Sequence, residues 1–201
     1  MKLTIPNQLT ILRIILTPVF IYYFPRDSMQ DKLIGTIIFL LASATDWYDG
    51  YIARRFNLIT RWGQFMDPLA DKILTASALC VFAYLNFLHW WMVSIMIMRD
   101  IIITFLRIFA LQLGKSIVTS YLAKVKTAVE MTAILILLLY LNFPEAEIQH
   151  LPAYPPPYTH WSTLLFSGVT LLTVFTAVQY LIENRSHVQE IYNRTVKLFG
   201  R

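Results

Sequence analysis

The sequence is poor in charge and has almost no cysteine. Only 14% of its 201 residues are charged and 57% are hydrophobic, whereas a soluble domain of this size is about 25% charged. The one cysteine, Cys80, lies in an apolar run and has no second thiol to pair with, which excludes a disulfide framework. The first apolar run is not followed by a small-residue cleavage site, so we expect no signal peptide to be removed. The composition therefore argues against an ordinary soluble enzyme and against a disulfide-rich secreted domain.

The abundant feature is a series of apolar blocks, each near the ~20 residues that cross ~30 Å of hydrocarbon as a helix. Alternating segments of ~10 residues, which are typical of a membrane barrel, do not occur. The sequence therefore predicts an all-α integral membrane protein that forms a single domain over residues 1–201, with short interfacial helices at the two termini, before Pro6 and over 187–199. The six predicted transmembrane helices cover residues 8–25, 33–56, 65–86, 90–113, 123–143 and 161–183.

Lysine and arginine indicate the orientation of these helices. Alternate connections carry nearly all of them, and the other connections hold only Arg26 and Lys32. Because cytoplasmic loops are the basic ones, we expect a multi-pass protein of the cytoplasmic (inner) membrane with both termini in the cytoplasm. The net charge of +5 then indicates contact with anionic lipid headgroups and not with nucleic acid.

Four aspartates lie where apolar helices should not carry charge. Asp46 and Asp49 come near the end of the second predicted helix, and Asp67 and Asp71 near the start of the third. Spacings of three and four place each pair on one helical face, and a short loop lets the two pairs face each other. Four carboxylates at this depth repel one another and are costly. Two divalent cations would neutralise them, and oxygen ligands favour Mg²⁺, with Mn²⁺ possible in its place.

Two other interpretations of the aspartates stay open at this point. Asp67 precedes Pro68, a combination that is common at a helix start, so the acids could cap helix ends. Intramembrane acids also form the cation path of some transporters, and a transporter would move ions without any other substrate.

The aspartates belong to a longer pattern, Asp46-x2-Asp49-Gly50-x2-Ala53-Arg54-x8-Gly63-x3-Asp67-x3-Asp71. This pattern resembles the signature of the CDP-alcohol phosphotransferase family. With the six predicted helices and the start Pro6-Asn7-x2-Thr10-x2-Arg13, the similarity covers essentially the whole chain. The resemblance implies an enzyme that transfers the phosphatidyl group of CDP-diacylglycerol to an alcohol and releases CMP, and it also implies a homodimer surrounded by membrane lipids.

The resemblance also implies roles for these residues. Asp46 and Asp67 would contact both of two Mg²⁺ ions, Asp49 one of them, and Asp71 the other while also acting as the base. Small residues leave one side of the hairpin bare for a phosphorylated group, although close helix packing would use them equally well. The residues expected along the CDP-lipid are Asn7, Thr10, Gly50, Ala53, Arg54, Thr60 and Gly63.

Within the family, the chain is most similar to members whose acceptor is sn-glycerol 3-phosphate, an anion that needs cations near the metals. Arg99 and Arg107 lie two turns apart on the fourth predicted helix and share a face, at a depth where arginine is costly without a partner or a function. We predict that Arg99, Arg107 and Lys126 hold the acceptor phosphate, with Lys124 and Lys115 nearby. Positive-inside topology alone is the alternative for the lysines. A cardiolipin synthase or an inositol-phosphate-type transferase is the alternative for the whole chain.

Overall fold

A computed structural model describes residues 5–56, 61–112, 121–143, 158 and 160–185. Within these residues every element is a helix, which confirms the all-α prediction, and each predicted transmembrane segment coincides with one helix to within a few residues. Residues 1–4 and the interfacial helix predicted over 187–199 lie outside the described part. The helices are α1 (Ile5–Tyr23), α2 (Met29–Arg55), α3 (Arg61–Tyr84), α4 (Trp90–Gln112), α5 (Tyr121–Tyr140) and α7 (Trp161–Glu183).

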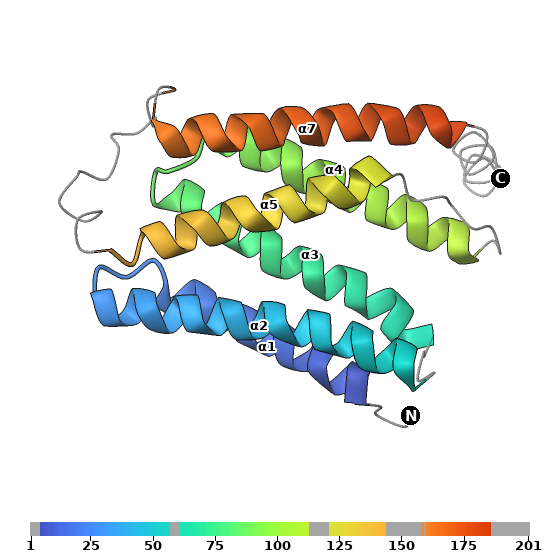
Figure 1. The fold of residues 1–201 in the computed structure, drawn as a ribbon, viewed down its shortest axis with the longest axis horizontal. Helices are drawn as coiled ribbons and strands as arrows, with labels where there is room; N and C mark the ends of the chain where they lie inside the picture. Colours follow the sequence, from blue (N-terminus) through green and yellow to red (C-terminus); the bar gives the residue numbers. More distant parts are fainter. Residues whose placement is uncertain (1–4, 57–60, 113–120, 144–157, 159, 186–201) are drawn as a thin grey trace, which may run out of the picture.

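The helices form a bundle in which α3 is central (Figure 1). On one side α1 packs against α2 and α3, and on the other α4 packs against α3 and α7, while α5 contacts α7 and α3. The start of α1, the end of α2, the start of α3 and the end of α7 all lie at the same end of the bundle (Figure 1). The two acid-bearing segments of α2 and α3 are therefore close to the first turns of α1.

Five fully buried phenylalanines join four of the helices. The rings of Phe20 and Phe24 lie 5.3 Å apart, and Phe20 is 5.4 Å from Phe39 of α2. Phe24 then meets Phe82 of α3 at 6.2 Å, and Phe82 meets Phe166 of α7 at the same separation. Tilted and edge-to-face pairs at these distances add to the stability that burial alone provides. This cluster holds the bundle together at the end opposite the acids.

Gly35 sets how closely α2 approaches the end of α1. A Cβ atom added at this position would lie 2.8 Å from Cβ of Phe24 and 2.9 Å from its Cα. Since one of these atoms is backbone, a side chain at position 35 would push the two helices apart.

The outer surface of the bundle is apolar and its interior holds charge. Arg13, Asp100, Lys126 and Glu130 are all buried, whereas large apolar side chains on α2, α4 and α7 are exposed. Among the described helices, α7 alone is long and apolar enough to cross a membrane by length and composition, with a mean hydropathy of 1.8. The most exposed apolar side chains of α4 and α7 are Met98, Phe105, Leu164, Leu171, Phe175 and Ile182.

Candidate active site

A cavity of about 310 Å³ opens between α2, α3, α4 and α5. Three of the four acids that the sequence predicts to converge line it, Asp46 of α2 with Asp67 and Asp71 of α3, whereas Asp49 is not among its lining residues. On α3 and α4 it is lined by Lys72, Arg99 and Asp100, so carboxylates and bases share one space. The remaining lining residues are Pro68, Ile103, Thr104, Ile108, Ala123 and Thr127.

The first helix contributes directly to the acid cluster. Arg13 is completely buried, and its Nη2 donates a hydrogen bond of 2.7 Å to Oδ2 of Asp49. Its Nη1 forms an ion pair with Oδ1 of Asp46 at 2.6 Å. Thr10, one turn earlier, donates from Oγ1 to Oδ1 of Asp67 at 2.5 Å. Sequence reasoning gave Arg13 no role, although an arginine inside an apolar helix was a signal that it needed a partner.

The interpretation of Asp67 as a helix cap is wrong. Helix α3 begins at Arg61, so Asp67 lies in its second turn, and Pro68 lies inside the helix. A proline there removes one intrahelical hydrogen bond. Asp49 likewise precedes the end of α2 at Arg55. Both acids therefore lie within a helix, and the helix geometry fixes the direction in which their side chains leave the backbone.

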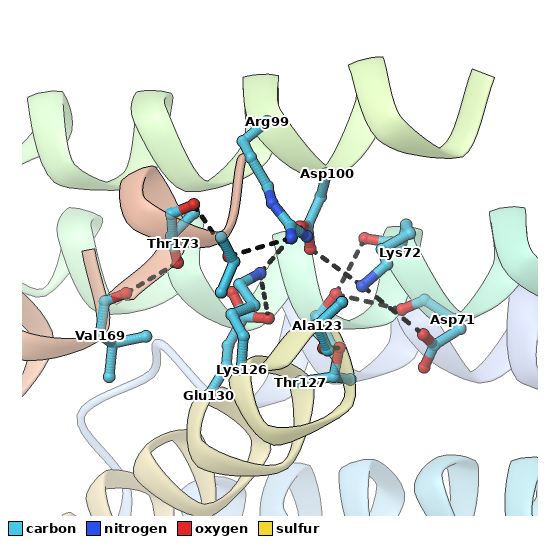
Figure 2. Close-up of polar contacts among 12 residues, drawn as sticks. Asp71, Lys72, Arg99, Asp100, Ala123, Lys126, Thr127, Glu130, Val169 and Thr173 are labelled. Carbon is cyan, nitrogen blue, oxygen red and sulfur yellow. Dashed lines mark hydrogen bonds and ion pairs between the residues drawn. The ribbon is translucent and has the colours of Figure 1, made fainter. Parts of the chain in front are cut away.

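A second charged cluster extends from the cavity into the bundle, and Figure 2 shows its side chains converging on Asp100. Oδ2 of Asp100 accepts from Nζ of Lys72 at 2.9 Å. Oδ1 accepts from Arg99 at 2.9 Å and from Lys126 at 2.8 Å. Lys126 also donates to Glu130 at 2.9 Å. Three bases, one each from α3, α4 and α5, thus surround the carboxylate of Asp100, and Glu130 contacts the third of them, Lys126.

The predicted phosphate-binding residues are not equivalent in the structure. Arg99 lines the cavity and donates to Thr176 of α7 at 3.1 Å. Lys126 is fully buried between two acids, and Lys124 is exposed on α5. The side chain of Arg107, on α4, and the whole of Lys115 lie outside the described part of the chain.

Lys72 is a cavity residue that sequence reasoning did not assign. It lies 2.9 Å from Asp100 and 3.9 Å from Oδ2 of Asp71, so it connects the acid cluster with the second cluster. Its position directly after Asp71 on an apolar helix was the available signal, because a lysine at membrane depth is costly without a partner.

The residues predicted to lie along the CDP-lipid are described in part. Asn7 and Thr10 are buried on α1, and Gly63 is buried on α3. Gly50, Ala53 and Arg54 belong to the last turns of α2, but their side-chain surroundings, like all of Thr60, lie outside the described residues.

The acids provide the right ligand type for Mg²⁺, because carboxylate oxygens are the ligands that hard cations prefer. Within the described residues, no three His, Cys, Asp or Glu side chains are grouped as a metal site. Arg13 instead provides a positive charge to Asp46 and Asp49. Three acids of the pattern nevertheless line one cavity, so the residues fit a divalent cation in chemistry and in location.

The described helices thus form an all-α bundle in which acids of two neighbouring helices line one cavity. The model of the CDP-alcohol phosphatidyltransferase family matches residues 3–182. This chain belongs to that family.

Three curated relatives to which the chain is similar are named CDP-diacylglycerol–glycerol-3-phosphate 3-phosphatidyltransferase. The relative from Sodalis glossinidius is 41% identical over 143 residues, which is 69% of this chain and 78% of the relative. The Salmonella typhimurium relative is 36% identical over 187 residues, or 90% of this chain and 94% of the relative. The Bacillus subtilis relative is 36% identical over 162 residues, or 72% and 84%.

Proposed function

We propose that this chain transfers the phosphatidyl group of CDP-diacylglycerol to sn-glycerol 3-phosphate, giving phosphatidylglycerophosphate and CMP. The observation that carries the proposal is the convergence of Asp46, Asp67 and Asp71 on one cavity. These are acids of the family pattern, on two different helices. The shared name of the relatives supports the choice of donor and acceptor.

Asp46, Asp49, Asp67 and Asp71 are the residues that would hold two Mg²⁺ ions. Bound there, the ions would supply positive charge to the diphosphate of the donor and make its phosphorus more electrophilic. Thr10 and Arg13 orient three of these acids from α1. Hydrogen bonds from such neighbouring residues keep carboxylates in the orientation that metal binding requires.

Asp71 is the proposed base. It lines the cavity beside Lys72 and is about one-quarter exposed, so an alcohol in the cavity can reach it. Asp71 accepts the proton of the acceptor's primary hydroxyl as that oxygen bonds to the lipid-side phosphorus. The bond from this phosphorus to the bridging oxygen breaks, and CMP leaves with the electron pair. A carboxylate suffices as base if the proton moves late, when the hydroxyl has become acidic.

The basic side chains that line the cavity favour an acceptor that carries negative charge. Arg99 lines the same space as Asp71, and a guanidinium is suited to a phosphate because it donates in a fork. Arg107, Lys124 and Lys115 complete the basic side that the sequence predicts, whereas Lys126, which the sequence also predicts there, is fully buried and does not line the cavity. A neutral alcohol would not need this charge.

The apolar exterior favours six membrane crossings. Soluble monomers rarely expose contiguous apolar surface beyond a few hundred Å², whereas large apolar side chains are exposed on every described helix of this bundle. Both ends of the described chain lie at the end of the bundle that holds the acids (Figure 1). With the basic connections on the cytoplasmic side, the active site faces the cytoplasm. The resemblance to the family also supports a homodimer.

An acceptor screen tests the proposed function. Purified protein, CDP-diacylglycerol and Mg²⁺ are mixed with glycerol 3-phosphate, phosphatidylglycerol or inositol phosphate in turn, and CMP release is measured. Glycerol 3-phosphate should give the fastest release. Faster release with phosphatidylglycerol or inositol phosphate would assign another acceptor. Cation flux in proteoliposomes that lack CDP-lipid, together with no CMP release, would favour a transporter.

A further inference from the structure

Resting on the function proposed above, we infer that the acceptor phosphate binds to Lys72 and Arg99, and that Lys126 is a positioning residue. In this assignment Asp100 lies between the two phosphate-binding bases and orients them, while Lys126, itself bonded to Glu130, holds Asp100 from the interior. The inference adds Lys72 to the acceptor site and changes the role predicted for Lys126.

Three basic side chains contact Asp100, and two of them line the cavity. Lys72 bonds Oδ2, while Arg99 and Lys126 bond Oδ1. Lys72 and Arg99 line the cavity, with side chains 20% and 10% exposed, whereas Lys126 has no exposed surface. An anion in the cavity can therefore reach Lys72 and Arg99 on the two sides of the carboxylate. It would reach Lys126 only after Lys126 left its own partners.

The hydrogen bonds of the two lysines also differ. Lys126 donates to Asp100 and to Glu130, each within 2.9 Å, and its partners are themselves buried. Lys72 makes one such bond, to Asp100, and Asp71 is more distant at 3.9 Å. Because an ammonium has three donors, Lys72 can bond a phosphate oxygen without giving up Asp100.

The cluster has balanced charges but one unused donor. Lys72, Arg99 and Lys126 carry three positive charges, and Asp100, Glu130 and Asp71, which lies 3.9 Å from Lys72, carry three negative ones. Within the described residues, the buried Nε of Arg99 has no hydrogen-bond partner. Buried donors nearly always have an acceptor, and a phosphate in the cavity would provide one for Arg99.

The position of Lys72 suits the reaction. Lys72 follows Asp71 in α3, and both side chains line the cavity. Glycerol 3-phosphate has its phosphate at one end and its primary hydroxyl at the other. A phosphate held by Lys72 and Arg99 therefore leaves the hydroxyl free to approach Asp71.

The test compares two lysines that contact the same carboxylate. Lys72→Met removes the cavity base and leaves Arg99 and Lys126 to balance Asp100 and Glu130, so the fold should hold. The double variant Lys126→Met with Glu130→Leu removes the buried pair together, a replacement that is often neutral or stabilising. Kinetics toward glycerol 3-phosphate and toward CDP-diacylglycerol are measured separately. Thermal protection by glycerol 3-phosphate, without CDP-lipid, reports binding directly.

Lys72→Met should raise KM for glycerol 3-phosphate by about ten- to a hundredfold, since bonds between charged groups are of that strength, and it should abolish thermal protection by the acceptor. KM for CDP-diacylglycerol should change little. The double variant should raise KM for the acceptor by only about a few-fold, because Asp100 keeps its bonds to Lys72 and Arg99, and it should keep the thermal protection. Arg26→Gln, a half-exposed arginine at the other end of the bundle, serves as the control for loss of charge.

Wild-type acceptor KM and protection in folded Lys72→Met would overturn the inference, as would a large rise of acceptor KM in the double variant. If Lys72→Met does not fold, Lys72→Arg replaces it, since it keeps the charge on Asp100 but moves the donors, and an unchanged acceptor KM in that variant would overturn the role of Lys72. Failure of the wild-type protein to use glycerol 3-phosphate would instead refute the proposed function, so the two failures are distinguishable.

Discussion

Arg13 of α1 donates a hydrogen bond of 2.7 Å to Asp49 of α2, and both side chains are buried. The two residues lie 36 positions apart, and their contact makes the first helix part of the acid cluster. The same guanidinium reaches Asp46 at 2.6 Å. Helix α1 therefore sets the charge and the direction of two acids that the family pattern places on α2.

Replacement of Arg13 should destabilise the protein strongly. Arg13→Gln removes the ion pair of a buried carboxylate, and breaking one side of a buried pair costs about 3–5 kcal/mol. We expect a clearly lower Tm in detergent and little transferase activity, with partial recovery of both in Arg13→Lys, which keeps the charge but loses the fork.

The control for Arg13 is Arg26, whose partner Asp31 lies 3.7 Å away on the surface. Exposed pairs contribute about 0–1 kcal/mol, so Arg26→Gln should leave Tm almost unchanged. Equal effects of the two substitutions on Tm would contradict a special role for Arg13.

Gly35 and Gly168 provide a matched test of packing. Gly35→Ala should lower Tm, because the new Cβ would lie 2.8 Å from Phe24, and overpacking of this kind costs about 1–3 kcal/mol. Gly168→Ala, on α7, meets nothing within 4 Å and should be neutral or slightly stabilising, since alanine favours a helix. A Gly35→Ala protein as stable as Gly168→Ala would show that α1 and α2 do not approach so closely.

Removal of divalent metal should abolish activity. Four carboxylates in and beside one cavity need more positive charge than Arg13 and Lys72 supply, and Mg²⁺ suits their oxygens. We expect CMP release to stop in excess EDTA and to return with Mg²⁺ or Mn²⁺. Undiminished release in EDTA would refute the assignment of Asp46, Asp49, Asp67 and Asp71 as metal ligands.

The helices and the acid cluster could be predicted from the sequence because each depends on local spacing. Apolar blocks of about 20 residues gave the helices, and the intervals of three and four placed Asp67 and Asp71 on one face. The partners of buried charges could not be predicted in this way. Periodicity gives the face of a helix but not the neighbour that covers it, so neither the contact of Arg13 with Asp49 nor that of Lys126 with Glu130 followed from the pattern.

The most direct test of the central claim is CMP release by Asp71→Asn in the presence of CDP-diacylglycerol, glycerol 3-phosphate and Mg²⁺, measured together with binding of CDP-diacylglycerol. Asparagine has nearly the shape of aspartate but cannot accept the proton of the hydroxyl. The account predicts that CMP release falls by at least about a hundredfold, as expected for loss of a general base. Binding of the CDP-lipid should persist, because Asp46, Asp49 and Asp67 remain. Release at a rate near that of the wild-type protein would contradict the assignment of this cavity as the site of phosphatidyl transfer with Asp71 as its base.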